Sequence, residues 1–262
     1  MVGSLFSGIG GFDLGLERAG MEVRWQVERD EWCRNVLAKH WPKVKRYGAI
    51  EDVNVETLEP VNLICGGFPC QPHSVANNRS RGGVDDERWL WPQFSRLVGI
   101  LRPRFVLVEN VTGLFTVNRG RAFGEILTDL AQLGYDCEWS VLSAADVGAP
   151  HLRKRVWIVA DADRTGLEGR ELLSQRADQW TTWATGLDDR RFLEDPISGD
   201  WEPQSRIRPL AHGISSRVAK LQALGNAVVP QCAEAIGHMI MARADTITTL
   251  GRKATKSGAK TS

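Results

Sequence analysis

The sequence predicts an α/β fold in which helices cover both faces of a largely parallel sheet. Short apolar runs alternate with amphipathic segments over residues 1–160, which is typical of strands and helices that follow one another in such a sheet. A glycine-rich turn follows the first apolar run, where nucleotide pockets of these folds begin. The chain has 262 residues, 42% of them hydrophobic, which is enough for one large core and a smaller appended piece.

The apolar runs set the expected strands, and the amphipathic segments set the helices between them. One helix is expected over Asp30–His40, where Asp30 provides the N-cap. Another has its apolar face over Phe123–Leu133 and ends at Gly134. The expected strands are Val2–Phe6, Val23–Val27, Val61–Cys65, Phe105–Val108, Cys137–Leu142 and Val156–Ala160.

The periodic pattern stops near position 160. The following stretch is rich in Gly, Asp, Arg and Pro and has no persistent apolar face, which predicts a small inserted module. Helical periodicity returns over Arg217–Leu224 and Gln231–Arg243, and the end of the chain is basic and small, as in a disordered tail. The expected units are a main domain, the module, C-terminal helices that complete the main domain, and the tail, over 1–160, 161–213, 214–245 and 246–262.

Composition argues against several classes of protein. The net charge is only +1, so a nucleic-acid surface would have to come from local clusters of arginine. The five cysteines are an odd number without a CxxC pair, which argues against a disulfide framework and a structural zinc site, and we expect no metal. We found neither a leader nor an apolar run that could span a bilayer, so a cytoplasmic protein without membrane contact is expected.

The glycine-rich turn has the pattern of a nucleotide-type pocket. Gly8, Gly10 and Gly11 stand between a strand and a helix, where backbone can approach a ligand closely. Asp13 takes the place of the third glycine of a GxGxxG fingerprint, which disfavours a dinucleotide enzyme. Glu28 follows the second expected strand, where a carboxylate can accept both hydroxyls of a ribose. An adenosine-bearing cofactor is one interpretation, and a tight turn with a solvated charge is the other.

A second group of residues carries chemistry. Cys70 lies past the end of an expected strand in LICGGFPCQPHS, so it projects towards a ligand cleft unless it is a small core residue. Glu109, with Asn110 beside it, ends the run RFVLVEN, and a carboxylate there needs a donor. Arg153 and Arg155 precede the strand VWIVA and lie on one side of it by strand alternation, so they could supply that donor.

These motifs together resemble those of the DNA (cytosine-5)-methyltransferase family, in the compact form found in bacteria and phages. LFSGIGG is similar to the cofactor loop of that family, GGFPCQ to its nucleophile loop and ENV at 109–111 to its ENV motif. GAPHLRKR resembles its arginine motif, with His151 in place of the usual glutamine, and ALGNAVVP its last motif. The resemblance covers nearly the whole chain. It implies a Rossmann-like, S-adenosylmethionine-dependent methyltransferase sheet with 161–213 as the target-recognition insert.

The resemblance also implies roles for individual residues. Cys70 would add to carbon 6 of a flipped-out cytosine, which activates carbon 5 towards methylation. Glu109 would bind ring N3, Arg155 the base carbonyl, and Arg153 the carboxylate and a phosphate. The implied cofactor contacts are Phe6, Gly8, Gly10, Gly11, Glu28, Ile50, Gly67, Pro69, Asn226 and Ala227. The expected nucleic-acid contacts are Ser74, Arg79, Arg81 and Arg88 after the nucleophile loop, with Arg206 and Arg208 in the insert.

Two positions depart from the pattern of the family. Ala49 stands where the third motif usually has an aspartate for the adenine amino group, and Asp52 nearby is an alternative acceptor. Arg29 follows Glu28 where an aromatic or apolar residue often covers the adenine. We expect a monomer that acts on double-stranded DNA. A transfer-RNA cytosine-5 methyltransferase and a non-catalytic DNA-binding relative remain as alternatives.

Overall fold

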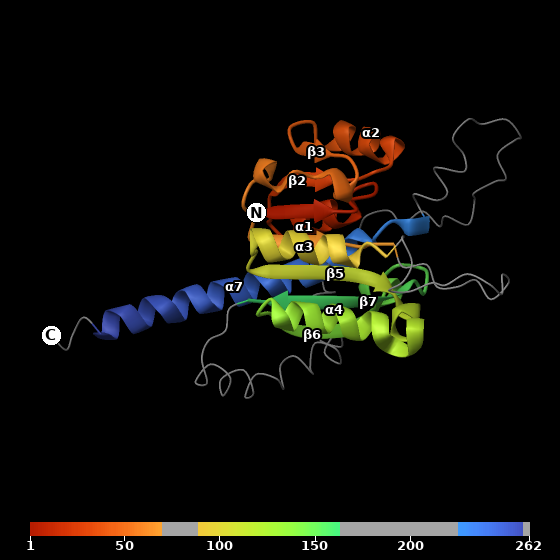
Figure 1. Cartoon of the computed structure of the whole chain (residues 1–262). Helices are drawn as coiled ribbons and strands as arrows, with labels where there is room; N and C mark the ends of the chain where they lie inside the picture. Colours follow the sequence, from red (N-terminus) through yellow and green to blue (C-terminus); the bar gives the residue numbers. More distant parts are fainter. Residues whose placement is uncertain (70–88, 163–224, 259–262) are drawn as a thin grey trace, which may run out of the picture.

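The computed structural model describes residues 1–69, 89–162 and 225–258, with the backbone alone over 245–258. Within these ranges a seven-stranded sheet has the order β3-β2-β1-β4-β5-β7-β6 and carries helices on both faces (Figure 1). The strands are β1 (Val2–Leu5), β2 (Val23–Val27), β3 (Lys45–Tyr47), β4 (Leu63–Gly66), β5 (Phe105–Val111), β6 (Asp136–Ser143) and β7 (Lys154–Asp161). The described α-helices are α1 (Gly11–Arg18), α2 (Glu31–His40), α3 (Trp91–Leu101), α4 (Arg121–Gln132) and α7 (Pro230–Gly258).

The direction of the strands brings several chain segments to one edge of the sheet. Strands β1 to β5 pair in parallel, and β7 runs antiparallel to both of its neighbours, β5 and β6. The carboxyl ends of β1, β2, β4 and β5 therefore meet the start of β7. We call this edge the site edge, because ligands of open α/β sheets bind outside the carboxyl ends of the strands.

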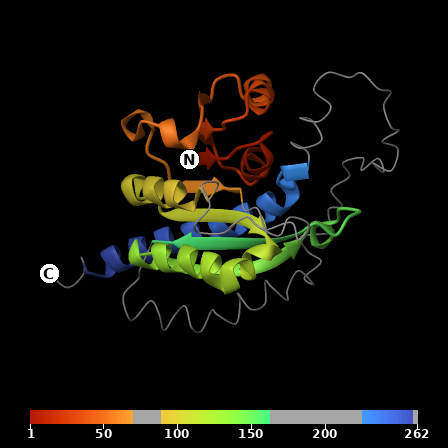
Figure 2. The ribbon, with the colours of Figure 1, turned by 45° about the vertical axis from the view of Figure 1, so that its right-hand side comes forward.

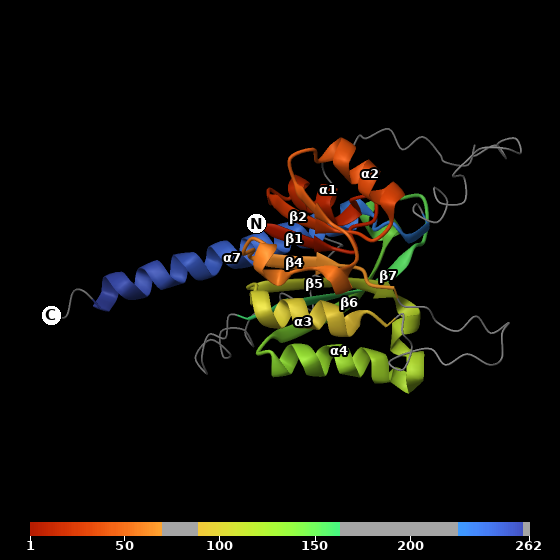
Figure 3. The same ribbon diagram turned by 45° about the horizontal axis from the view of Figure 1, so that its top comes forward.

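Helices lie on both faces of the sheet (Figures 2 and 3), and an apolar layer holds them on each face. On one face α3 and α4 bury residues such as Phe94 and Ile126 in a cluster with the side chains of β4 and β5. On the other face α1 and α7 pack together, and Leu16 and Ile236 are completely buried between them and the sheet. The part of the chain after residue 225 thus packs against α1, the helix that follows the first strand.

An arginine fixes α7 to the opposite edge of the sheet. Arg243 Nε lies 2.9 Å from Asp161 Oδ2 at the end of β7, and its Nη1 lies 3.3 Å from Glu138 Oε1 on β6. Asp161 and Arg243 are both largely shielded from solvent, so this contact is screened less than a surface ion pair. The ion pairs therefore hold α7, at Arg243, against the ends of β6 and β7.

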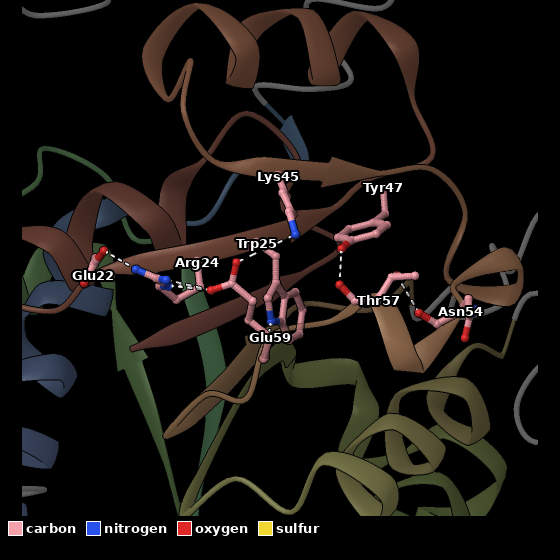
Figure 4. A network of polar contacts seen from close by, with 8 residues as sticks. All are labelled: Glu22, Arg24, Trp25, Lys45, Tyr47, Asn54, Thr57 and Glu59. Atoms are coloured by element: carbon pink, nitrogen blue, oxygen red, sulfur yellow. Dashed lines mark hydrogen bonds and ion pairs between the residues drawn. The ribbon is translucent and has the colours of Figure 1, made fainter.

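A polar network holds the segment between β3 and β4 against β2 (Figure 4). Glu59 accepts from Arg24 at 2.7 Å and lies 3.8 Å from Lys45 Nζ, while its backbone carbonyl accepts from Trp25 Nε1 at 2.9 Å. The hydroxyl of Tyr47 donates to the carbonyl of Thr57 at 2.7 Å. The contact at Thr57 fixes the 3-10 helix η2 (Val55–Thr57), which follows the 3-10 helix η1 (Ile50–Asp52).

The structure confirms the predicted fold class and changes several boundaries. Strand β5 continues to Val111, and β7 begins at Lys154, so Glu109 and Arg155 lie inside strands rather than at their ends. The short strand β3 was not predicted. Helix α2 begins after Asp30, whose side chain accepts from Cys33 N as expected. Helix α7 extends to Gly258, into the stretch that the sequence led us to expect as a disordered tail.

Other expectations about the organisation of the chain stay predictions. The helix expected over Arg217–Leu224 and nearly all of the module expected over 161–213 lie outside the described residues. The domain boundaries therefore also remain predictions. Among the described residues, no helix is long and apolar enough to cross a membrane.

A buried carboxyl group joins α1 to the first two strands. Asp13 is completely buried and accepts from Gln26 Nε2 at 2.8 Å and from Ser4 Oγ at 3.1 Å. Burial raises the pKa of Asp13 from 3.8 to about 6, although both hydrogen bonds favour the charged form. The neutral partners therefore do not compensate for the lost hydration of the carboxylate.

This burial predicts a pH-dependent stability that Asp13→Asn removes. Because the folded-state pKa is raised, the contribution of Asp13 is fully present at low pH and is lost as pH rises through about 6. Between pH 5 and 8 the wild type should lose about 1 kcal/mol of unfolding free energy relative to Asp13→Asn. Urea denaturation of both proteins at the two pH values measures this difference. A difference that does not change with pH would contradict the prediction.

Candidate functional site

The loop after β1 and the end of β2 form one half of the site edge. Glu28 Oε2 accepts from Gly8 N at 2.8 Å, and its Oε1 accepts from Asp30 N at 2.8 Å. The carboxylate therefore ties the glycine-rich loop to the start of α2. Each carboxylate oxygen can accept more than one hydrogen bond, so both oxygens keep capacity for the hydroxyls of a ligand.

The glycine-rich loop has a backbone conformation that ordinary side chains would disrupt. Gly10 has φ +89°, and a Cβ added there would lie 2.4 Å from the ring of Trp41. Phe6, at the start of the loop, also has a positive φ of 52° without being glycine, which is a strained conformation. Ile50, from η1, is buried in the core near this half of the site edge. The loop is thus held in one shape by α2 and by its own hydrogen bonds.

The other half of the site edge contains a buried ion pair. Glu109 on β5 is buried, and its Oε1 lies 3.1 Å from Arg155 Nε on β7. The register of the two strands, with Val111 opposite Arg155, brings these side chains together. Burial raises the pKa of Glu109 to about 7, and the charges of Arg155 and Arg153 act in the opposite direction. A carboxyl group that titrates near pH 7 is suited to proton transfer.

The loop that leads to Cys70 lies directly beside Glu109. A Cβ added at Gly67 would lie 3.0 Å from Glu109 Oε2, and Asn110 Nδ2 donates to the carbonyl of Phe68 at 3.1 Å. The ring of Phe68 is held in place by Trp89, against which it packs edge-on with centroids 5.2 Å apart. The chain is described up to Pro69, which is exposed. The backbone therefore passes the Glu109 carboxyl immediately before it reaches position 70.

Arg153 has a different partner from the one expected. Its Nη1 donates to the carbonyl of Gly225 at 2.7 Å, whereas Arg155 makes the ion pair with Glu109. Of the neighbouring residues expected to close the cofactor pocket, Asn226 is exposed and Ala227 is half-buried. Arg153 therefore joins the start of β7 to the segment before α7, a contact that sequence reasoning did not find.

The remaining expected site residues lie outside the described part of the chain: Cys70, Ser74, Arg79, Arg81, Arg88, Arg206 and Arg208. Two further contacts in the described part were also missed. One is the hydrogen bond from Asn110 to the carbonyl of Phe68. Asn110 was noted only as a neighbour of Glu109, although a polar side chain expected to be buried needs a hydrogen-bond partner of its own. The packing of Trp41 on Gly10 had no signal, because the two residues belong to different elements.

Comparison with known proteins identifies the family. The family model described as C-5 cytosine-specific DNA methylase matches residues 1–185. The chain belongs to this family. This methylase-family chain is 37% identical over 170 residues to the Type II methyltransferase M.NgoFVII of Neisseria gonorrhoeae. The match covers 64% of this chain and 45% of that protein. The chain spans about half the length of curated relatives such as this one.

Solved structures show the same fold. A crystal structure of a prophage-encoded DNA modification methyltransferase of E. coli is 31% identical to this methylase-family chain, with a TM-score of 0.52. That match covers 61% of this chain and 46% of the other. The S. pombe Dnmt2 methyltransferase, at 20% identity and a TM-score of 0.51, shares the fold over 63% of this chain and 51% of its own. The fold and the family thus agree with the resemblance that the motifs carry.

The environment of Glu109 predicts a measurable titration. In ¹³C NMR spectra of glutamate-labelled protein, the Glu109 carboxyl carbon should titrate with a midpoint of about 7. Replacement of its partner in Arg155→Met should raise the midpoint further, because the guanidinium favours the charged carboxylate. The signal is assigned by its loss in Glu109→Gln. A midpoint close to the ordinary value for glutamate would show that the group is hydrated instead of buried.

Proposed function

We propose that this protein transfers a methyl group from S-adenosylmethionine to carbon 5 of a cytosine flipped out of double-stranded DNA. The observation that carries the proposal is the buried Glu109, which has a pKa of about 7 and lies beside the backbone that leads to Cys70. A proton donor and a nucleophile loop then lie on the same sheet edge as the glycine-rich loop. Membership of the cytosine-specific methylase family supports the same reaction.

The residues in the half of the site edge formed by the loop after β1 and the end of β2 fit the cofactor. Glu28 retains acceptor capacity for two ribose hydroxyls, and at Gly8 an added Cβ would lie 4.0 Å from its nearest neighbour, so the backbone there has room for a ligand. Ile50 would cover one side of the adenine, and Asn226 and Ala227 would close the pocket. Phe6, Gly67 and Pro69 complete the proposed contacts. When bound, S-adenosylmethionine supplies an electrophilic methyl group on a sulfonium.

The residues of the Glu109 half would activate the base. The Cys70 thiolate would form a bond to carbon 6 while N3 accepts a hydrogen bond or proton from Glu109, which places electron density on carbon 5. Methyl transfer to carbon 5 would leave S-adenosylhomocysteine. Loss of the carbon 5 proton to solvent and release of the thiolate from carbon 6 would then restore the ring, while the proton on N3 returns to Glu109. Arg155 would bind the base carbonyl and hold Glu109 in position. The base must leave the stack first, because neither ring face is accessible in a duplex.

DNA is favoured over the alternatives as the substrate. The matching family model describes a DNA methylase, and the curated relatives are named Type II methyltransferases. A non-catalytic relative would not need Glu109 and Arg155 as a buried pair, and the pair is present. We further propose that residues 161–213, with Arg206 and Arg208, recognise the target sequence. Ser74, Arg79, Arg81 and Arg88 would contact the DNA backbone after Cys70.

Incorporation of labelled methyl groups tests the proposed function. Purified protein is incubated with labelled S-adenosylmethionine and either unmethylated duplex DNA or transfer RNA. The label should enter DNA as 5-methylcytosine and should not enter RNA. Label in RNA alone would favour the transfer-RNA alternative, and binding of DNA without transfer by an intact, cofactor-binding protein would favour a non-catalytic relative.

The assigned nucleophile predicts a covalent trap. Duplex DNA with 5-fluorocytosine at the target should become attached to Cys70, because fluorine cannot leave carbon 5 as a proton does. The adduct should require S-adenosylmethionine and should be visible as a shifted band on a denaturing gel. It should be absent with Cys70→Ala, whereas Cys33→Ala, which alters a buried cysteine elsewhere, should still form it. An equally abundant adduct with Cys70→Ala would assign the nucleophile to another residue.

A further inference from the structure

Two arginines near the start of β7 point to different partners. Arg155 lies 3.1 Å from Glu109, and Arg153 donates to the carbonyl of Gly225 at 2.7 Å. The Nε of Arg153 is also buried and has no hydrogen-bond partner among the described residues, so neither of these donors goes to Glu109. Arg153 acts on Glu109 only through its charge, since the geometry assigns the direct contact to Arg155.

Segment 225–229, which Arg153 contacts at Gly225, packs against the end of the glycine-rich loop. A Cβ added at Gly11 would lie 2.3 Å from the carbonyl oxygen of Val228, so this backbone lies against the first residue of α1. Val228 and Val229 pack against the core cluster that contains Phe12. Segment 225–229 therefore has two fixed points. One is Arg153 at Gly225, and the other is the start of α1, directly after the loop that contains Gly8 and Gly10.

We infer that Arg153 is a positioning residue for the cofactor pocket, which it shapes by holding segment 225–229 against the glycine-rich loop. The inference rests on the proposed function, in which Asn226 and Ala227 of this segment close the pocket. A hydrogen bond from a charged donor is stronger than one between neutral groups, and this one joins the exposed Gly225 to a side chain that is itself half-buried. Without it, Gly225 is released while Val228 stays packed, so the two residues between them lose their fixed positions. The expected consequence is weaker binding of S-adenosylmethionine.

The experiment separates cofactor binding from chemistry. Calorimetry without DNA measures the affinity for S-adenosylmethionine, and single-turnover methylation with saturating cofactor and DNA measures the chemical step. Arg153→Ala should bind the cofactor about tenfold more weakly, as expected for the loss of one charge-assisted hydrogen bond. Its single-turnover rate should fall much less than that of Arg155→Ala, because Arg153 acts on Glu109 through its charge and not through a direct contact. Arg153→Lys keeps a charged donor and should recover part of the lost affinity.

Arg155 and Arg243 provide matched comparisons. Arg155→Ala should show the opposite split, with cofactor affinity nearly unchanged and a single-turnover rate lower by about a hundredfold, because it removes the partner of Glu109. Arg243→Ala removes the other arginine that ties the C-terminal part of the chain to β7, through Asp161 at the far edge of the sheet. It should lower the melting temperature and leave cofactor affinity unchanged.

Two results would overturn the assignment. If Arg153→Ala binds S-adenosylmethionine as tightly as wild type and loses the methylation rate, then Arg153 belongs with Glu109 and Arg155. If Arg153→Ala and Arg243→Ala weaken cofactor binding equally, the effect is a general loosening of α7. Wild-type protein that binds the cofactor without methylating DNA would contradict the proposed function, whereas the comparison of cofactor affinities would still decide the role of Arg153.

Discussion

The antiparallel pairing of β5 with β7 is the constraint on which the Glu109 half of the site depends. β7 is the strand that runs against the direction of its neighbours, so its beginning lies where β5 ends. Arg155, which precedes an apolar run, is thereby placed two register positions from Glu109 on the paired strand, within reach of its carboxylate. A parallel β7 would put Arg155 at the far edge of the sheet, and Glu109 would be buried without a cation. Such an isolated charge is costly to bury, so the topology and the ion pair support each other.

Two buried carboxyl groups, those of Asp13 and Glu109, differ in their partners and in their place on the sheet. Asp13 lies between α1 and the sheet, and in the described part of the chain its side-chain donors are the neutral Ser4 and Gln26. Glu109 lies at the sheet edge and has Arg155 as a cationic partner. Burial raises the pKa of both, but of the two only Glu109 lies at the site edge, next to the backbone of Gly67. Asp13 therefore contributes to the packing of α1, and Glu109 is available for proton transfer.

The sequence predicted the fold and the residues near the site better than it predicted their contacts. Apolar runs mark strands well, and the polar residues after them, such as Glu28 and Glu109, were found for that reason. The strand Lys45–Tyr47 was missed because three residues with two charges have no apolar pattern; it forms by pairing with β2. Boundaries near Glu109 were too short because a buried carboxylate reads as a strand end, although its backbone continues to pair up to Val111.

The contact between Arg153 and Gly225 shows why some of the site could not be predicted. The donor is a side chain, but the acceptor is a backbone carbonyl, which every residue has, so no residue type at position 225 marks the contact. The choice between Glu109 and Gly225 as the partner of Arg153 depends on where segment 225–229 returns to the sheet. That position is set by the start of α7, which packs against α1. The environment of Arg153 is thus a property of the assembled fold, and the two arginines of one motif have different partners because different parts of the chain reach them.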